Sequence, residues 1–173
     1  MKTKNFVILF GGFFVLSFIV AYLVPSARGP LPLLDSYSSF VSTFIPMIRR
    51  IGWLSIRLNM APAYYFSLMW IAAFVLYLAL LRCPHDYFLS PEKARSKRGF
   101  IAFMCLAVIP LANVYFYFLP VTHATRIVTV LTVSRSGLAI SGWVHLSGFV
   151  LMTRFWWAWF RQRKLIYQSG SAG

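Results

Sequence analysis

The chain has 173 residues, of which 60% are apolar and only 12% are charged. A soluble domain carries about 25% charged residues, so this composition excludes an ordinary soluble globular domain. Lys and Arg number 17 against 3 Asp and Glu, a net charge of +14, and because basic residues beside apolar spans meet anionic headgroups, we predict contact with anionic membrane lipids and no nucleic-acid partner.

Four apolar blocks without Asp or Glu predict that the chain crosses a membrane four times. The hydrocarbon core is about 30 Å thick and needs roughly 20 apolar residues in a helix. We therefore predict an all-α, polytopic integral membrane protein: a single four-helix transmembrane domain over residues 1–173, with interfacial amphipathic helices in the outer loops. The blocks are 6–24, 63–81, 99–119 and 138–160, joined by outer loops 25–62 and 120–137 and a cytoplasmic loop 82–98.

The first block follows Lys2 and Lys4 and has 19 residues without a charge. It is longer than the roughly 7–15 apolar residues of a signal peptide, so we predict a retained helix. The two termini and loop 82–98 then share one side and carry ten basic residues, against six in the two outer loops. The positive-inside rule places both termini in the cytoplasm.

The first outer loop contains an amphipathic stripe that follows Asp35, a plausible helix N-cap, and is interrupted by Pro46, which should kink the helix. Such a stripe fits a helix on the outer membrane surface, either as a lid over the bundle or as a docking site for a partner. The stripe consists of Tyr37, Phe40, Val41, Phe44, Ile48 and Ile51. The candidate outer-loop contacts are the basic residues Arg49, Arg50 and Arg57.

The third block contains two residues that are costly inside a membrane helix. Pro110 frees a backbone carbonyl that a neighbour must satisfy, and Asn113 can hydrogen-bond across to another helix. Together they predict a kink and a packing contact, which makes Asn113 a candidate intramembrane contact. Cys83 and Cys105 are predicted to be small buried side chains without a disulfide between them.

The second outer loop holds a short segment of eight uncharged residues between Arg126 and Arg135. A segment of this length cannot cross the hydrocarbon core. Its many β-branched residues leave helix and strand both open. Three interpretations therefore remain: an interfacial helix, a re-entrant segment, or an early extension of the fourth span.

Small and polar residues share one face of the fourth block. Ser141, His145 and Gly148 recur at spacings of 4 and 3, which predicts a helix–helix contact face and makes all three candidate intramembrane contacts. Arg154 follows among aromatic residues typical of a membrane-interface belt, so we expect its guanidinium to reach out to the headgroups. The expected lipid-interface residues are Arg154, Trp156, Trp157 and Trp159.

The three acidic residues, Asp35, Asp86 and Glu92, all lie in loops. Paired-carboxylate hydrolysis, metal-dependent transfer and carboxylate-based ion coupling lack their reactive groups in the spans. The sequence also contains neither a phosphate-binding glycine loop nor a metal-binding His or Cys motif. We therefore predict no enzymatic activity, no catalytic or metal-binding residues, no cofactor and no small-molecule substrate, but a membrane protein as partner.

Two short segments carry a likeness to a known family. Arg57-Leu58-Asn59-Met60-Ala61-Pro62 precedes the second span, and Val121-Thr122-His123-Ala124 precedes the fourth. With its length, basic charge and four-span layout, the chain resembles the immunity proteins of the pore-forming colicins of the A, B and N group. This resemblance implies a bacterial inner-membrane protein that recognises a toxin's hydrophobic hairpin within the bilayer. The alternative is an accessory or structural subunit of a larger inner-membrane complex, such as secretion, conjugation or respiratory machinery.

Overall fold

A computed structural model describes residues 3–27, 29, 31–54, 57–83 and 134–170, and the single residues 92, 96, 100, 101, 103, 104, 108 and 111. Every regular element within these residues is an α-helix, which confirms the all-α prediction for the described part of the chain. The helices are α1 (Thr3–Leu23), α2 (Pro32–Phe44), α3 (Pro46–Leu54), α4 (Ala61–Leu81) and α9 (Arg135–Gly170).

Three of these helices are long and apolar enough to cross a membrane, over Asn5–Leu23, Ala61–Leu81 and Arg135–Gln162. The 21 residues of α1 and of α4 give each a length of about 31 Å, close to the thickness of a hydrocarbon core. The described residues thus contain three candidate membrane spans, as expected of a membrane protein. Most of the predicted third span, 99–119, and residues 120–133 of the second outer loop lie outside the described residues.

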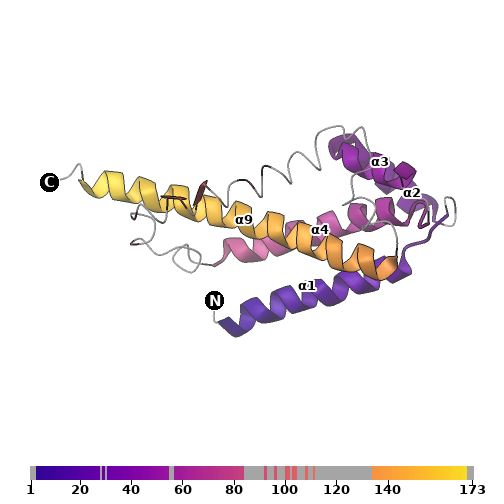
Figure 1. The fold of residues 1–173 in the computed structure, drawn as a ribbon, viewed down its shortest axis with the longest axis horizontal. Helices are drawn as coiled ribbons and strands as arrows, with labels where there is room; N and C mark the ends of the chain where they lie inside the picture. Colours follow the sequence, from indigo (N-terminus) through magenta and orange to yellow (C-terminus); the bar gives the residue numbers. More distant parts are fainter. Residues whose placement is uncertain are drawn as a thin grey trace.

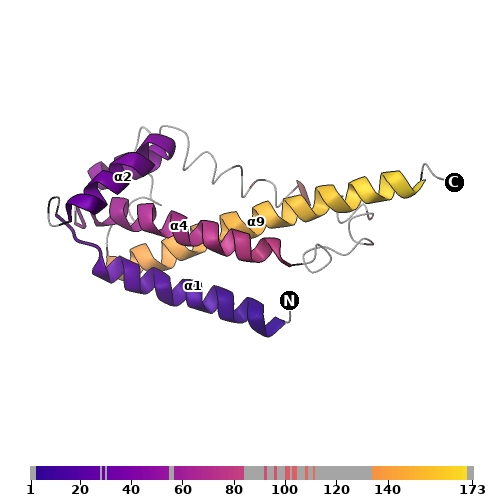
Figure 2. The same ribbon diagram turned by 180° about the vertical axis from the view of Figure 1, so that it is seen from behind.

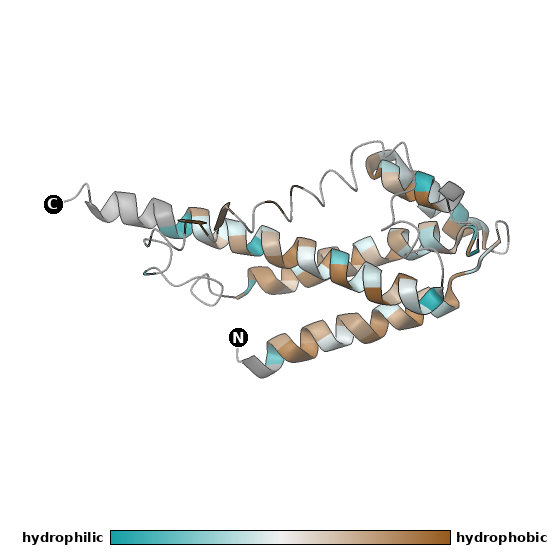
Figure 3. Cartoon of the chain, in the orientation of Figure 1, coloured by the Kyte–Doolittle hydropathy of each residue, from teal (hydrophilic) through white to brown (hydrophobic). Residues whose placement is uncertain are grey.

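The three long helices form a bundle in which α4 and α9 run parallel and α1 runs antiparallel to both (Figures 1 and 2). The first turn of α1 and the last turns of α9 lie at the same end, which we call the terminal end. We call the opposite end, where α2 and α3 lie, the rim end. The hydropathy colouring shows long apolar stretches on α1 and α4 with few polar turns (Figure 3).

Helix α9 is longer than the block that predicted it. The span was expected at 138–160, whereas the helix begins at Arg135 and has 36 residues, or about 54 Å. Residues 135–137, assigned to the outer loop from the sequence, therefore belong to the helix. The additional turns after 160 carry α9 beyond the ends of α1 and α4 (Figure 1).

Two prolines determine where the helices of the first loop begin. Helix α2 starts at Pro32, whose fixed φ suits a first turn and whose missing N–H needs no partner there. Asp35 is consequently not the predicted N-cap, because it lies inside the first turn, where a carboxylate favours the positive helix end. Pro46 does more than kink the helix: α2 ends at Phe44, and a separate α3 starts at Pro46.

The connection into α4 explains the Asn-Met-Ala-Pro segment physically. Asn59 has a φ of +46°, a left-handed conformation that Asn tolerates better than most residues. The next amide, of Met60, donates to the Ser26 carbonyl at 2.9 Å and ties this turn to the end of α1. Pro62 then occupies the first turn of α4.

The start of α4 is the centre of the fold. All seven residues from 61 to 67 are buried, so this segment is enclosed on every side. Helices α1, α2, α3 and α9 all contact α4. A helix segment that is covered all round is the expected core of such an assembly.

Candidate functional site

Polar side chains attach α2 to the start of α4. Asp35 accepts hydrogen bonds from the Tyr64 hydroxyl and from the Gly29 amide, the latter at 2.9 Å. About one turn further along α4, the Ser67 carbonyl accepts a hydrogen bond from the Tyr37 hydroxyl at 3.1 Å. Burial raises the pKa of the Tyr37 phenol above its ordinary value of 10.0, so this group stays protonated as a donor at neutral pH.

Apolar packing strengthens the same attachment, because one face of α2 and α3 is buried against α4. The Ser67 hydroxyl, 3.1 Å from the Ser38 hydroxyl, is fully enclosed within this contact. A helix pair held by both apolar burial and several hydrogen bonds has little freedom to move relative to α4. The buried apolar residues of this face are Val41, Ile45, Met47, Ile48 and Ile51.

A second apolar face of α2 is exposed. Leu33, Phe40 and Phe44 are 87%, 63% and 62% exposed, and we call them the rim patch. The rings of Phe40 and Phe44 meet edge to face, with centroids 5.2 Å apart. The predicted single stripe is therefore divided: Val41 and Tyr37 face α4, while Phe40 and Phe44 point away, since neighbouring helix positions differ by about 100°.

Basic side chains lie close to the rim patch in sequence. Arg49 on α3 and Arg57 after it are exposed, and Arg50 is half-buried. The one acidic residue described at this end, Asp35, is occupied by its contacts with Tyr64 and Gly29. The surface that the described rim residues present is therefore apolar and positive.

A buried polar cluster joins the three long helices near the rim end. Ser17 on α1 donates to the Ala139 carbonyl on α9 at 2.7 Å. Because this uses its only proton, Ser17 accepts from the Tyr65 hydroxyl of α4 at 2.6 Å. Gly142, one turn after Ala139, leaves the space that the Tyr65 ring fills, since a Cβ at this position would lie 2.7 Å from its Cζ.

The face of α9 that packs on α1 and α4 runs beside the predicted contact residues. Ser141 and His145 are only half-buried, and a Cβ added at Gly148 would meet nothing within 4 Å. The face that packs on α1 and α4 instead passes through Gly142 and Leu146, both of which are buried. Both faces have helical periodicity and contain small residues, so the sequence pattern alone does not distinguish them.

Arg135, at the start of α9, caps the end of α1. Its guanidinium donates to the carbonyls of Ala21 at 2.6 Å and Val24 at 2.7 Å, and to the Ser26 hydroxyl at 2.9 Å. The last carbonyls of a helix have no partners within it and carry partial negative charge. A cation at this position therefore satisfies the end of α1 and fixes α9 against it.

Arg154 caps the end of α4 in the same way. Its Nε donates to the Leu80 carbonyl and its guanidinium to the Cys83 carbonyl, both at 3.1 Å. The side chain is fully buried, so it does not reach out to the headgroups as expected. Inward-facing carbonyls at the end of α4 offer it better acceptors than the membrane surface, because they need donors where water is scarce.

The aromatic belt after Arg154 is partly covered. Trp159 is buried and stacks on Phe103 with ring centroids 3.9 Å apart and an interplanar angle of 8°. Trp156 is half-buried, 5.8 Å from the same ring, whereas Trp157 is 52% exposed, as a residue at the lipid interface would be. Phe103 belongs to the third apolar block, so that block contacts α9 here.

The two capping arginines are 19 residues apart on α9. At 1.5 Å per residue this separation is about 28 Å, close to the thickness of a hydrocarbon core. We therefore expect Arg135 and Arg154 to lie at the two levels where hydrocarbon gives way to headgroups. Each stands where a neighbouring helix ends, α1 at Arg135 and α4 at Arg154.

Several site residues were not predicted from the sequence. Ser17 and Tyr65 were read only as members of apolar blocks, and Arg135 only as a loop charge. An arginine directly before a span is a weak signal for such a cap. Asn113, predicted as an intramembrane contact, lies outside the described residues.

Comparison of the chain with protein-family models, with curated proteins and with solved structures finds no match.

Proposed function

We propose that this chain is a non-enzymatic binding protein of the bacterial inner membrane whose rim end receives a membrane-inserting segment of another protein. The observation that carries this proposal is the rim patch of Leu33, Phe40 and Phe44, exposed on a helix that α4 holds firmly. In this proposal the rim end faces the periplasm and the terminal end the cytoplasm, in keeping with the count of basic residues.

The rim patch supports binding because it is both apolar and fixed. Burying one Phe side chain contributes roughly 1.5–3 kcal/mol. The hydrogen bonds of Asp35 and Tyr37 to α4 hold α2 in place before any partner arrives. Little conformational entropy is then lost on association, so more of the burial energy appears as affinity.

The exposed charges of the same loop indicate the chemistry of the occupant. Exposed Arg49 and Arg57 favour a partner with carboxylates next to an apolar helix. The hydrophobic hairpin of a pore-forming toxin, approaching from the periplasm, has the required apolar character. This occupant also agrees with the family that the sequence resembles, so we propose an immunity function.

The test is protection of bacterial cells. Cells that express the chain are challenged with a panel of pore-forming bacteriocins, and loss of membrane potential is followed with a dye. We expect protection against one pore-former. In cells with the Phe40→Ala, Phe44→Ala double variant, the highest toxin dose that the cells withstand should fall at least tenfold. Leu31→Ala, which changes another exposed apolar residue at the rim end, should leave protection intact.

Purification in mild detergent distinguishes the alternative. A chain that purifies alone from its own host supports the immunity proposal. Stoichiometric co-purification with other membrane proteins would overturn it in favour of an accessory subunit. Equal protection by the double variant and by Leu31→Ala would show that the rim patch is not the binding surface.

A further inference from the structure

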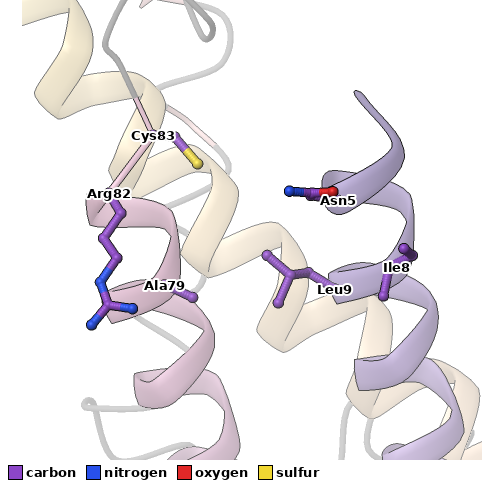
Figure 4. Close-up of a pocket in the computed structure, with 6 residues that line it drawn as sticks. All are labelled: Asn5, Ile8, Leu9, Ala79, Arg82 and Cys83. Carbon is purple, nitrogen blue, oxygen red and sulfur yellow. The ribbon is translucent and has the colours of Figure 1, made fainter. Parts of the chain in front are cut away.

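A cleft opens between α1 and α4 at the terminal end, opposite the rim patch (Figure 4). Its volume of about 420 Å³ falls within the roughly 300–1,000 Å³ typical of ligand sites. Residues from the start of α1 face residues from the end of α4 across it. The lining residues are Asn5, Ile8, Leu9, Ala79, Arg82 and Cys83.

The lining changes from polar to apolar along the bundle axis. Asn5 and Arg82 lie nearest the ends of their helices, while Ile8, Leu9 and Ala79 lie one turn further into the bundle. In Figure 4 Asn5 and Leu9 of α1 point toward Ala79 and Cys83, whereas the Arg82 side chain extends along the outer side of α4. The cleft is therefore polar at the membrane edge and apolar toward the hydrocarbon.

The cleft also has a positive charge without a negative one. Arg82 is exposed, and no carboxylate is among the described lining residues. The helix-end carbonyls of Leu80 and Cys83 already accept hydrogen bonds from Arg154. The guanidinium of Arg82 is thus not needed to cap α4 and remains available for an external anion.

We propose that this cleft binds one anionic phospholipid, with the phosphate at the exposed Arg82 and an acyl chain along Ile8, Leu9 and Ala79. A phosphodiester accepts charge-assisted hydrogen bonds from a guanidinium. The apolar half of the lining favours a lipid over free phosphate, which has no group to occupy it. The proposal does not depend on the function of the rim patch at the other end.

Native mass spectrometry of the detergent-purified protein tests the site. Delipidated protein is titrated with phosphatidylglycerol, with phosphatidylcholine and with inorganic phosphate. We expect one phosphatidylglycerol to bind per chain, more tightly than phosphatidylcholine, and Arg82→Gln to weaken this binding about fivefold. Arg161→Gln, which removes an exposed arginine of α9 outside the cleft, should not weaken it.

A second pair of variants tests the apolar half. Ala79→Phe fills the cleft and should reduce retained phosphatidylglycerol, whereas Leu78→Phe, on an exposed position of the same helix, should not. Thermal unfolding in detergent identifies any variant that has lost its fold. Equal binding of both lipids, equal effects of Arg82→Gln and Arg161→Gln, or full competition by inorganic phosphate would each overturn the proposal.

Discussion

The two ends of the bundle use the same device and differ in what surrounds it. At the rim end Arg135 caps α1, and at the terminal end Arg154 caps α4, each through backbone carbonyls. Arg135 is half-buried beneath the first loop, while Arg154 is completely enclosed and stands near an open cleft. These two arginines therefore also complete helix ends, by donating to backbone carbonyls that have no partner within the helix.

The largest expected effect comes from the enclosed arginine. Arg154→Leu keeps an apolar side chain at the site but leaves the Leu80 and Cys83 carbonyls without these donors, at a cost of about 3 kcal/mol. The matched change Arg135→Leu should cost about 1–2 kcal/mol, because water reaches the half-buried end of α1. Unfolding in mixed detergent micelles measures both. Equal losses of stability would show that the deeper burial of Arg154 does not make its cap worth more than that of Arg135.

Next in size is the glycine on which Tyr65 packs. Gly142→Ala places a methyl group against the Tyr65 ring, so the bundle must shift, at a cost of about 2 kcal/mol. Gly148→Ala, on the same helix, meets nothing within 4 Å and should be neutral or slightly stabilising. The same unfolding assay applies. A destabilising Gly148→Ala with a neutral Gly142→Ala would restore the contact face predicted from the sequence.

These two glycines show which part of the fold the sequence predicts. Long apolar blocks predicted α1, α4 and α9 as candidate spans, because this requires only length and few charges. The contact face was not predictable in this way. Gly142 and Gly148 both suit close packing, and only the shape of the neighbouring Tyr65 ring selects one of them.

Polar residues at the candidate site were predicted in position but not in role. Arg154 was expected to face headgroups and Asp35 to cap a helix, yet each has a partner on α4, Leu80 for Arg154 and Tyr64 for Asp35. Their partners lie 74 and 29 residues away in the chain, so local pattern carries no trace of them. The rim patch was likewise hidden, because Phe40 and Val41 have similar polarity and only packing separates them.

A smaller effect tests how firmly the rim is attached. Tyr64→Phe removes the hydrogen bond to the Asp35 carboxylate and should cost about 1.5 kcal/mol. Tyr22→Phe removes an exposed hydrogen bond to Ser136 near the same end and should cost less than about 0.5 kcal/mol. Hydrogen exchange locates the loss: faster exchange is expected in α2 for Tyr64→Phe alone. Unchanged exchange in α2 would mean that apolar burial alone holds the rim.

The smallest effect concerns the turn that leads into α4. Asn59→Gly should be close to neutral, since Gly adopts a φ of +46° freely, whereas Asn59→Val should cost about 1–2 kcal/mol. The loss should appear in hydrogen exchange at the rim end, where the Met60 amide bonds to Ser26, and not around Arg154 at the terminal end. Equal acceleration at both ends would show that the bundle unfolds as one unit. Loosening confined to the rim would show that the end proposed to bind a partner opens independently of the end that Arg154 closes.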